Sequence, residues 1–140
     1  MKALSFAVAL VLAAPTVPIA AHACGMKESY RPSRPADLYV YALDEIENGS
    51  YGTALSAARK LVKHANASKE MKAKGWTVIA WVRWANGNQA QAREALTSAK
   101  QLDAGAIIAV LGKIKAAEKK VTEELRDEAS KVTVAVAPEA

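Results

Sequence analysis

Apolar residues recur at helical spacing through residues 37–132, and two short polar turns containing glycine interrupt them. From residue 76 to residue 85 the apolar positions follow one another in steps of three and four, the period of an amphipathic helix. A second run, from Ala92 to Ala99, has the same period. Gly87-Asn88 lies between the two runs; glycine tolerates the left-handed conformation that ends a helix, and asparagine suits the start of the next one. The pattern predicts two helices joined by a tight turn.

An upstream segment has the same arrangement in a weaker form. The corresponding positions of the two segments are Leu38 and Trp76, Ala42 and Ala80, Gly49 and Gly87, Ala54 and Ala92, and Ala58 and Leu96. Small residues at such positions let two packed helices approach to an interaxial distance of about 8–10 Å. Because the turns are short, consecutive helices should be antiparallel neighbours. The sequence therefore predicts two helical hairpins in series.

This spacing resembles the tetratricopeptide repeat, a unit of about 34 residues with the pattern Trp-x2-Leu-Gly-x2-Tyr, then Ala-x3-Phe, then Pro. The second copy reads Trp76-x2-Ile79-Ala80-x2-Arg83, then Ala92-x3-Leu96, then Ala104. The residues expected to pack inside the hairpin are Trp76, Ile79, Ala80, Ala92 and Leu96. Arg83 departs from the family's Tyr and Ala104 from its Pro, so a helical bundle without repeats remains the alternative.

The resemblance also implies a concave binding groove lined by the first helix of each repeat. Carried over residue by residue, it places seven residues in that groove: Tyr39, Leu43, Ile46, Lys74, Thr77, Trp81 and Trp84. Thr77, Trp81 and Trp84 share one helical face. Tryptophan is a frequent hot-spot residue, so the groove is expected to bind a peptide or protein. In the alternative, a later helix folds into the groove and buries both rings.

Beyond the hairpins, one apolar face predicts a single long helix over about residues 105–132. Its members are Ile107, Leu111, Ile114, Val121, Leu125 and Val132. Such a helix is expected to cap the exposed apolar face of the last hairpin. Ile107, Ile114 and Val121 have seven-residue spacing, which leaves a coiled-coil homodimer open. The predicted fold is all-α, with two tetratricopeptide-like hairpins and a long C-terminal capping helix over residues 37–132, followed by a loose tail over 133–140.

The first 23 residues have the features of a secretory signal peptide: Lys2, an apolar run and Ala21-His22-Ala23. Cys24 follows the expected cut directly and is the only cysteine, so the chain can form no internal disulfide. Acylation of Cys24, as in bacterial lipoproteins, and plain cleavage are both open. Residues 24–36, which include two prolines, are expected to form an extended tether. The protein is thus predicted to be exported, periplasmic or extracellular, with membrane contact only through an acylated Cys24.

Candidate chemistry is sparse, and the sequence predicts a protein that is not an enzyme and has no cofactor. His64 is the only histidine after residue 23 and has no second metal ligand at a suitable spacing. The net charge of +5 comes without a basic stripe interleaved with aromatic residues, which argues against nucleic acid. The predicted function is an envelope adaptor that binds an unidentified protein or peptide. The alternative is a structural or oligomerising lipoprotein that acts through its C-terminal helix.

Overall fold

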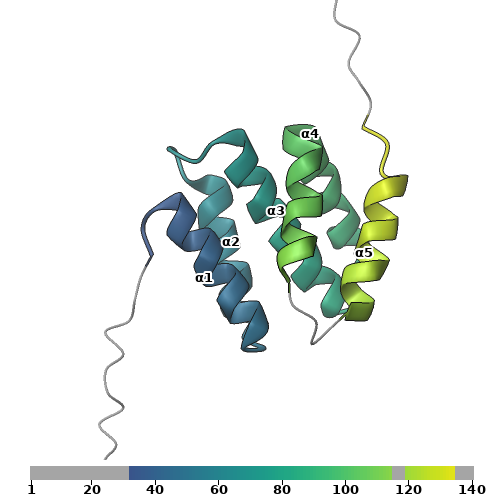
Figure 1. The fold of residues 1–140 in the computed structure, drawn as a ribbon, viewed down its shortest axis with the longest axis horizontal. Coiled ribbons are helices and arrows are strands. Elements are labelled where there is room, and N and C mark those ends of the chain that lie inside the picture. Colours follow the sequence, from purple (N-terminus) through teal and green to yellow (C-terminus); the bar gives the residue numbers. More distant parts are fainter. Residues whose placement is uncertain (1–31, 115–118, 135–140) are drawn as a thin grey trace, which may run out of the picture. The chain divides into compact units, whose positions relative to one another are not determined.

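The computed structural model describes residues 32–114 and 119–134, and this part of the chain is helical with no strand (Figure 1). The helices are α1 (Pro35–Glu47), α2 (Tyr51–Lys63), α3 (Lys69–Ala85), α4 (Gln89–Lys113) and α5 (Lys119–Lys131). The all-α class predicted from the sequence is confirmed. The expected signal peptide (1–23), Cys24, most of the tether and residues 135–140 of the tail lie outside the described residues. No helix within the described ranges combines the length and the apolar character needed to cross a membrane.

The turns that follow α1 and α3 have the same backbone geometry, the Schellman motif. After α1, the Gly49 N–H bonds the Ile46 carbonyl at 3.0 Å and the Ser50 N–H bonds the Glu45 carbonyl at 2.8 Å. The turn after α3 repeats both hydrogen bonds around Gly87. Gly49 and Gly87 have φ angles of 73° and 79°, a conformation that glycine adopts without the steric cost of a Cβ atom. The two glycines therefore determine where α1 and α3 end.

Helix starts depend less on side-chain caps than the sequence suggests. Asn88 makes no side-chain capping bond to α4, although asparagine directly before a helix predicts one. Ser68 does cap α3, because its Oγ accepts the Met71 N–H at 3.2 Å. α1 begins with Pro35 at its first position, within the segment expected to be a tether. Proline suits this position because its fixed φ is already helical and its missing N–H would have no partner there.

Asp103 interrupts α4 with an extended backbone, at φ −163° and ψ 105°. Its Oδ1 accepts the N–H of Gly105 at 2.9 Å and lies 3.3 Å from the N of Ala106. Asp103 thus acts as the N-cap of the second half of α4, at the place where the sequence predicts a new helix to begin.

The prediction of one long helix over residues 105–132 is wrong. α4 ends at Lys113, where Ile114 leaves the helical region with a ψ of 103°, and α5 begins anew at Lys119. α5 contacts both α3 and α4, and its Leu125 is fully buried. A straight continuation of α4 would leave Leu125 without this partner surface. Burial of an amphipathic face against the preceding helices therefore outweighs helical continuity.

Alanines lie where consecutive helices meet. α1 contacts α2, α2 contacts α3, and α3 contacts α4 (Figure 1). Four alanines that the sequence places at small positions are fully buried: Ala42, Ala54, Ala80 and Ala92. Ala58, at the position where the second copy has Leu96, is fully buried as well. α2 and α3 approach closely at Gly75, where an added Cβ would lie 2.9 Å from Val62 Cγ2 and 3.2 Å from the Ala58 carbonyl oxygen. Small side chains therefore set the spacing of the bundle.

Candidate functional site

The seven residues that the resemblance places in a concave groove are mostly enclosed by the chain itself. Five of them are buried, namely Tyr39, Ile46, Thr77, Trp81 and Trp84. Leu43 and Lys74 are half-buried. The Thr77 hydroxyl donates to the Ala73 carbonyl at 2.9 Å, within its own helix. Little of this face is therefore open to a partner.

Helix α5 covers two of the three tryptophans. Trp81, 1% exposed, donates its indole N–H to the Thr122 Oγ1 at 3.1 Å. Trp84, 8% exposed, donates to the Glu124 Oε2 at 2.7 Å. The ring of Tyr51, on α2, packs edge-on against Trp81 with centroids 5.5 Å apart. A partner could reach these two indoles only after α5 had moved.

The end of α4 reaches the ring of Tyr39 on α1. The Lys113 Nζ lies 5.7 Å from the ring centroid, and the Lys74 Nζ lies 5.5 Å from it. The buried Tyr39 hydroxyl has no hydrogen-bond partner among the described residues. Burial, with a smaller contribution from the charge of Glu70, raises the pKa of Tyr39 above its ordinary value. The phenol is thus held in its neutral form beneath two ammonium groups.

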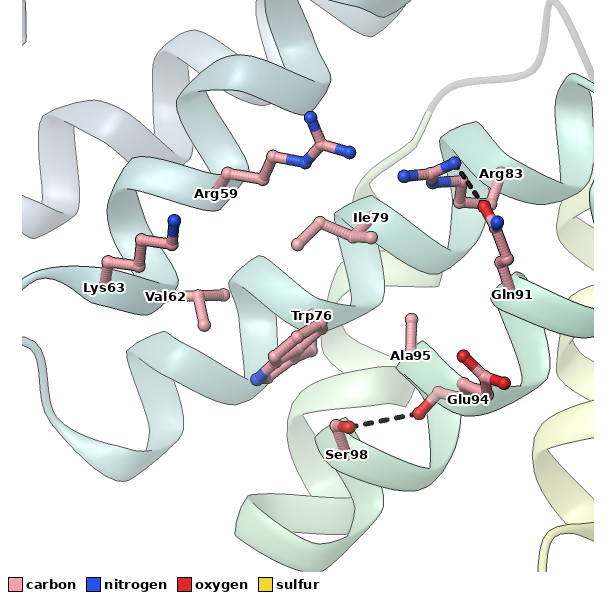
Figure 2. A pocket seen from close by; sticks show the side chains of 10 residues that line it. All are labelled: Arg59, Val62, Lys63, Trp76, Ile79, Arg83, Gln91, Glu94, Ala95 and Ser98. Atoms are coloured by element: carbon pink, nitrogen blue, oxygen red, sulfur yellow. Dashed lines mark hydrogen bonds between the residues drawn. The ribbon is translucent and has the colours of Figure 1, made fainter.

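An open cavity of about 510 Å³ lies between α2, α3 and α4, and we call it the α2–α4 groove (Figure 2). The residues that line it are Arg59, Val62 and Lys63 from α2, Trp76, Ile79 and Arg83 from α3, and Gln91, Glu94, Ala95 and Ser98 from α4. Trp76 is half-buried, so the groove contains the one tryptophan of the described residues that is not enclosed. This volume lies within the range of about 300–1,000 Å³ typical of ligand pockets.

Helical spacing brings the lining residues together. Arg59 and Lys63 are one turn apart on α2, and Val62 lies between them in the sequence. On α3, Trp76, Ile79 and Arg83 follow at steps of three and four and share a face. Figure 2 shows both sets facing the side chains of α4 across the same opening. The floor of the groove is apolar, because Val62, Trp76, Ile79 and Ala95 supply it.

The rim of the groove carries more positive than negative charge. Arg59, Lys63 and Arg83 are cations, whereas Glu94 is the one carboxylate of the lining. None of these four charged groups belongs to an ion pair within residues 32–114 and 119–134. α2 contains no Asp or Glu that could neutralise its cations. The side chain of Arg83 instead donates to the Gln91 Oε1 (Figure 2). The groove therefore combines an apolar floor with unpaired positive charge.

The described residues offer no arrangement for metal chemistry. No three His, Cys, Asp or Glu side chains gather there in a way that could hold a metal ion. His64 has a structural role, since its Nδ1 accepts the Asn66 N–H at 3.1 Å and its Nε2 lies 3.0 Å from the Ser33 carbonyl oxygen. With Nδ1 as the acceptor, a neutral ring carries its proton on Nε2 and donates to Ser33. Through these two hydrogen bonds, His64 connects the segment before α1 to the turn after α2.

Comparison with known proteins adds no assignment to this geometry. The sequence matches no protein-family model, and no curated protein or solved structure is significantly similar to it. The groove must therefore be interpreted from its own residues.

The α2–α4 groove is not among the sites that the sequence predicts. Its Trp76 and Ile79 were expected only to pack inside the hairpin, and Arg59 and Lys63 belong to no predicted site. Both cations flank Val62 on a helix without acidic residues, so neither has a neutralising partner one turn away. Unpaired cations beside an apolar position are a pattern that the sequence already contains.

Proposed function

We propose that the protein is an exported, tetratricopeptide-like adaptor that binds a protein or peptide partner in the α2–α4 groove. The observation that carries this proposal is the half-buried Trp76 on the floor of an open groove, while Trp81 and Trp84 lie under α5. Tryptophan concentrates binding energy when a partner desolvates it. Its position in a cavity with no metal cluster and no nucleophile–base pair favours binding over catalysis.

Repeated turns support the tetratricopeptide-like interpretation of residues 35–102. Gly49 and Gly87 close the same Schellman motif, and a pair of contacting helices flanks each turn. Alanines are buried at the small positions of both copies. The second half of α4 and α5 then cover the apolar face of the second copy, which a terminal repeat cannot bury alone.

The proposed binding surface differs from the groove expected from the resemblance. α5 covers Trp81 and Trp84, where the resemblance implies a concave groove, whereas the α2–α4 groove is open. We therefore place the partner beside Trp76, on the side of the repeats where α2 and α4 face each other. Export is part of the proposal on the basis of residues 1–24 alone, and acylation of Cys24 and plain cleavage before it both stay open. Mass spectrometry of the mature N-terminus distinguishes them, because an acylated Cys24 adds the mass of its acyl chains and plain cleavage leaves a free thiol.

The alternative, an oligomerising lipoprotein, has less support. Its coiled-coil stripe consists of three residues at seven-residue spacing. Ile107 and Ile114 are buried within the chain, and Val121 is half-buried. Ile108 is exposed by 69% but lies outside that stripe. The face available for a coiled coil is therefore already used by the protein's own packing.

Site-directed photo-crosslinking in the native envelope tests the proposal. A photoreactive residue at Lys63, which lines the groove, should give a discrete adduct with the partner. The same residue at Lys60, exposed on the same turn of α2 but outside the groove, serves as the control. The Trp76→Ala change should remove the Lys63 adduct. Adducts of equal yield at both positions, or a Lys63 adduct that persists without Trp76, would contradict the proposal.

A further inference from the structure

We infer that the partner of the α2–α4 groove presents an acidic segment with an apolar side chain, which packs on Trp76 while its carboxylates face Arg59 and Lys63. This inference rests on the proposed function and specifies the chemistry of the partner. It follows from two properties of the groove, the unpaired cations of its rim and the apolar character of its floor.

The charge of the groove selects carboxylates. Arg59, Lys63 and Arg83 make no ion pair within the described residues, and the lining contains three cations against the one carboxylate of Glu94. Arg59 and Lys63 are also exposed, which keeps their charged ends accessible to a partner. An arginine can bind a carboxylate through two parallel hydrogen bonds, and lysine adds a point charge. Positive potential over the opening also accelerates the approach of an acidic partner.

The floor selects an apolar anchor beside those carboxylates. Trp76 is half-buried, and its indole N–H has no hydrogen-bond partner among the described residues, in contrast to Trp81 and Trp84. Val62 and Ile79 flank it in the same lining. A cavity of about 510 Å³ has room for one or two large side chains, and burying them against an indole would supply most of the affinity.

Charge also varies across the groove, which gives the partner an orientation. Figure 2 shows Trp76 between the two cations of α2 on one side and Glu94 of α4 on the other. Carboxylates of the partner are attracted to the α2 side and repelled by Glu94. A bound segment should therefore place its acidic residues over α2 and a neutral or basic residue near Glu94.

Selection from a display library of random short peptides on the mature protein tests the inference without assuming a sequence. Enriched peptides should contain Asp or Glu next to a large apolar residue. A synthetic copy of an enriched peptide should lose about tenfold or more in affinity when Asn and Gln replace its Asp and Glu. In ¹H–¹⁵N spectra, its binding should shift the indole signal of Trp76 and leave those of Trp81 and Trp84 in place.

Two charge reversals on α2 serve as a matched pair. Lys63→Glu should weaken the peptide severalfold, whereas Lys60→Glu changes the net charge equally but lies outside the groove and should weaken it far less. Unchanged Trp81 and Trp84 indole signals show that each variant is folded.

Each contrary result overturns a different part of the inference. Enriched peptides that need Trp76 but contain no excess of acidic residues overturn the charge selection and leave the proposed function standing. Equal losses for Lys60→Glu and Lys63→Glu overturn the placement of the carboxylates at the groove. A library that gives no peptide with a preference for the native protein over Trp76→Ala overturns this inference together with the proposed function.

Discussion

The indole N–H of Trp84, on α3, lies 2.7 Å from a carboxylate oxygen of Glu124, on α5. This bond and the one from Trp81 to Thr122 join the last helix to the middle of the bundle. α5 has 13 residues, of which only Thr122 and Leu125 are buried. These polar contacts therefore add to the packing of Leu125 and of the half-buried Val121 and Ala129 in holding α5 on the bundle.

Replacing Glu124 with Ala should loosen α5 selectively. The change leaves the Trp84 N–H without its acceptor in a partly buried position, which should lower the free energy of unfolding by about 1–2 kcal/mol. Glu123→Ala is the control, because Glu123 is exposed and makes no hydrogen bond among the described residues. Hydrogen exchange should show faster opening of the α5 amides only in the Glu124 variant. Equal exchange in both variants would mean that the bond does not hold the helix.

Low pH should weaken the attachment of α5 to the bundle, because it protonates Glu128. Hydrogen bonds from Arg93 and Lys131, at 2.9 and 3.2 Å, lower the pKa of the Glu128 carboxyl below its ordinary value. A carboxyl with a lowered pKa in the folded state stabilises that state above its unfolded pKa, and this contribution is lost as the pH falls through the folded pKa. Urea unfolding between neutral pH and about pH 3 should therefore show stability falling towards acid.

Glu128→Gln isolates this contribution, since its amide does not titrate. The variant should be less stable than the native protein at neutral pH, and the two should converge towards acid pH. Because Glu128 is close to solvent, the difference should shrink when salt is added. A constant difference at all pH values would show that the ion pair with Arg93 has no part in stability.

Gly75 should tolerate no side chain, in contrast to Gly52. A Cβ there would lie 2.9 Å from Val62 Cγ2 and close to the Ala58 carbonyl, so Gly75→Ala should push α2 and α3 apart and lower the free energy of unfolding by about 1–3 kcal/mol. A Cβ at Gly52 meets nothing within 4 Å, and Gly52→Ala should stabilise α2 by about 0.5–1 kcal/mol. Opposite shifts in the thermal midpoint check this, and a stabilised Gly75 variant would contradict it.

The sequence predicted those parts of the fold that local chemistry determines. Gly49 and Gly87 end helices because their φ angles are positive, and this preference is readable without any tertiary contact. Periodic apolar residues gave the helices, and the buried Ala42 and Ala80 follow from the same pattern. A helix start near Gly105 was predicted as well, and Asp103, a residue type that favours the N-cap position, lies just before it.

The sequence alone does not predict the direction of the chain after Ile114. Periodicity continues from Leu111 to Val121 and Leu125, so the pattern alone favours an unbroken helix. The return of α5 depends on the surface that Trp81 and Trp84 offer, which exists only after α3 and α4 have packed. The location of the open groove depends on the docking of α5. Once α5 covers one face of α3, the face with Trp76 is the one left accessible.

This arrangement predicts an order of importance among the tryptophans for stability. Trp81 is 1% exposed and contacts Tyr51 and Thr122, so Trp81→Ala should leave a cavity and lower the free energy of unfolding by about 3–5 kcal/mol. Trp76 lies half-buried at an open groove, where solvent can fill the vacated space, so Trp76→Ala should cost about 1–2 kcal/mol. Chemical denaturation of the two variants measures the difference. If Trp76→Ala proves as costly as Trp81→Ala, then Trp76 belongs to the packed interior, and the groove loses the residue on which binding depends.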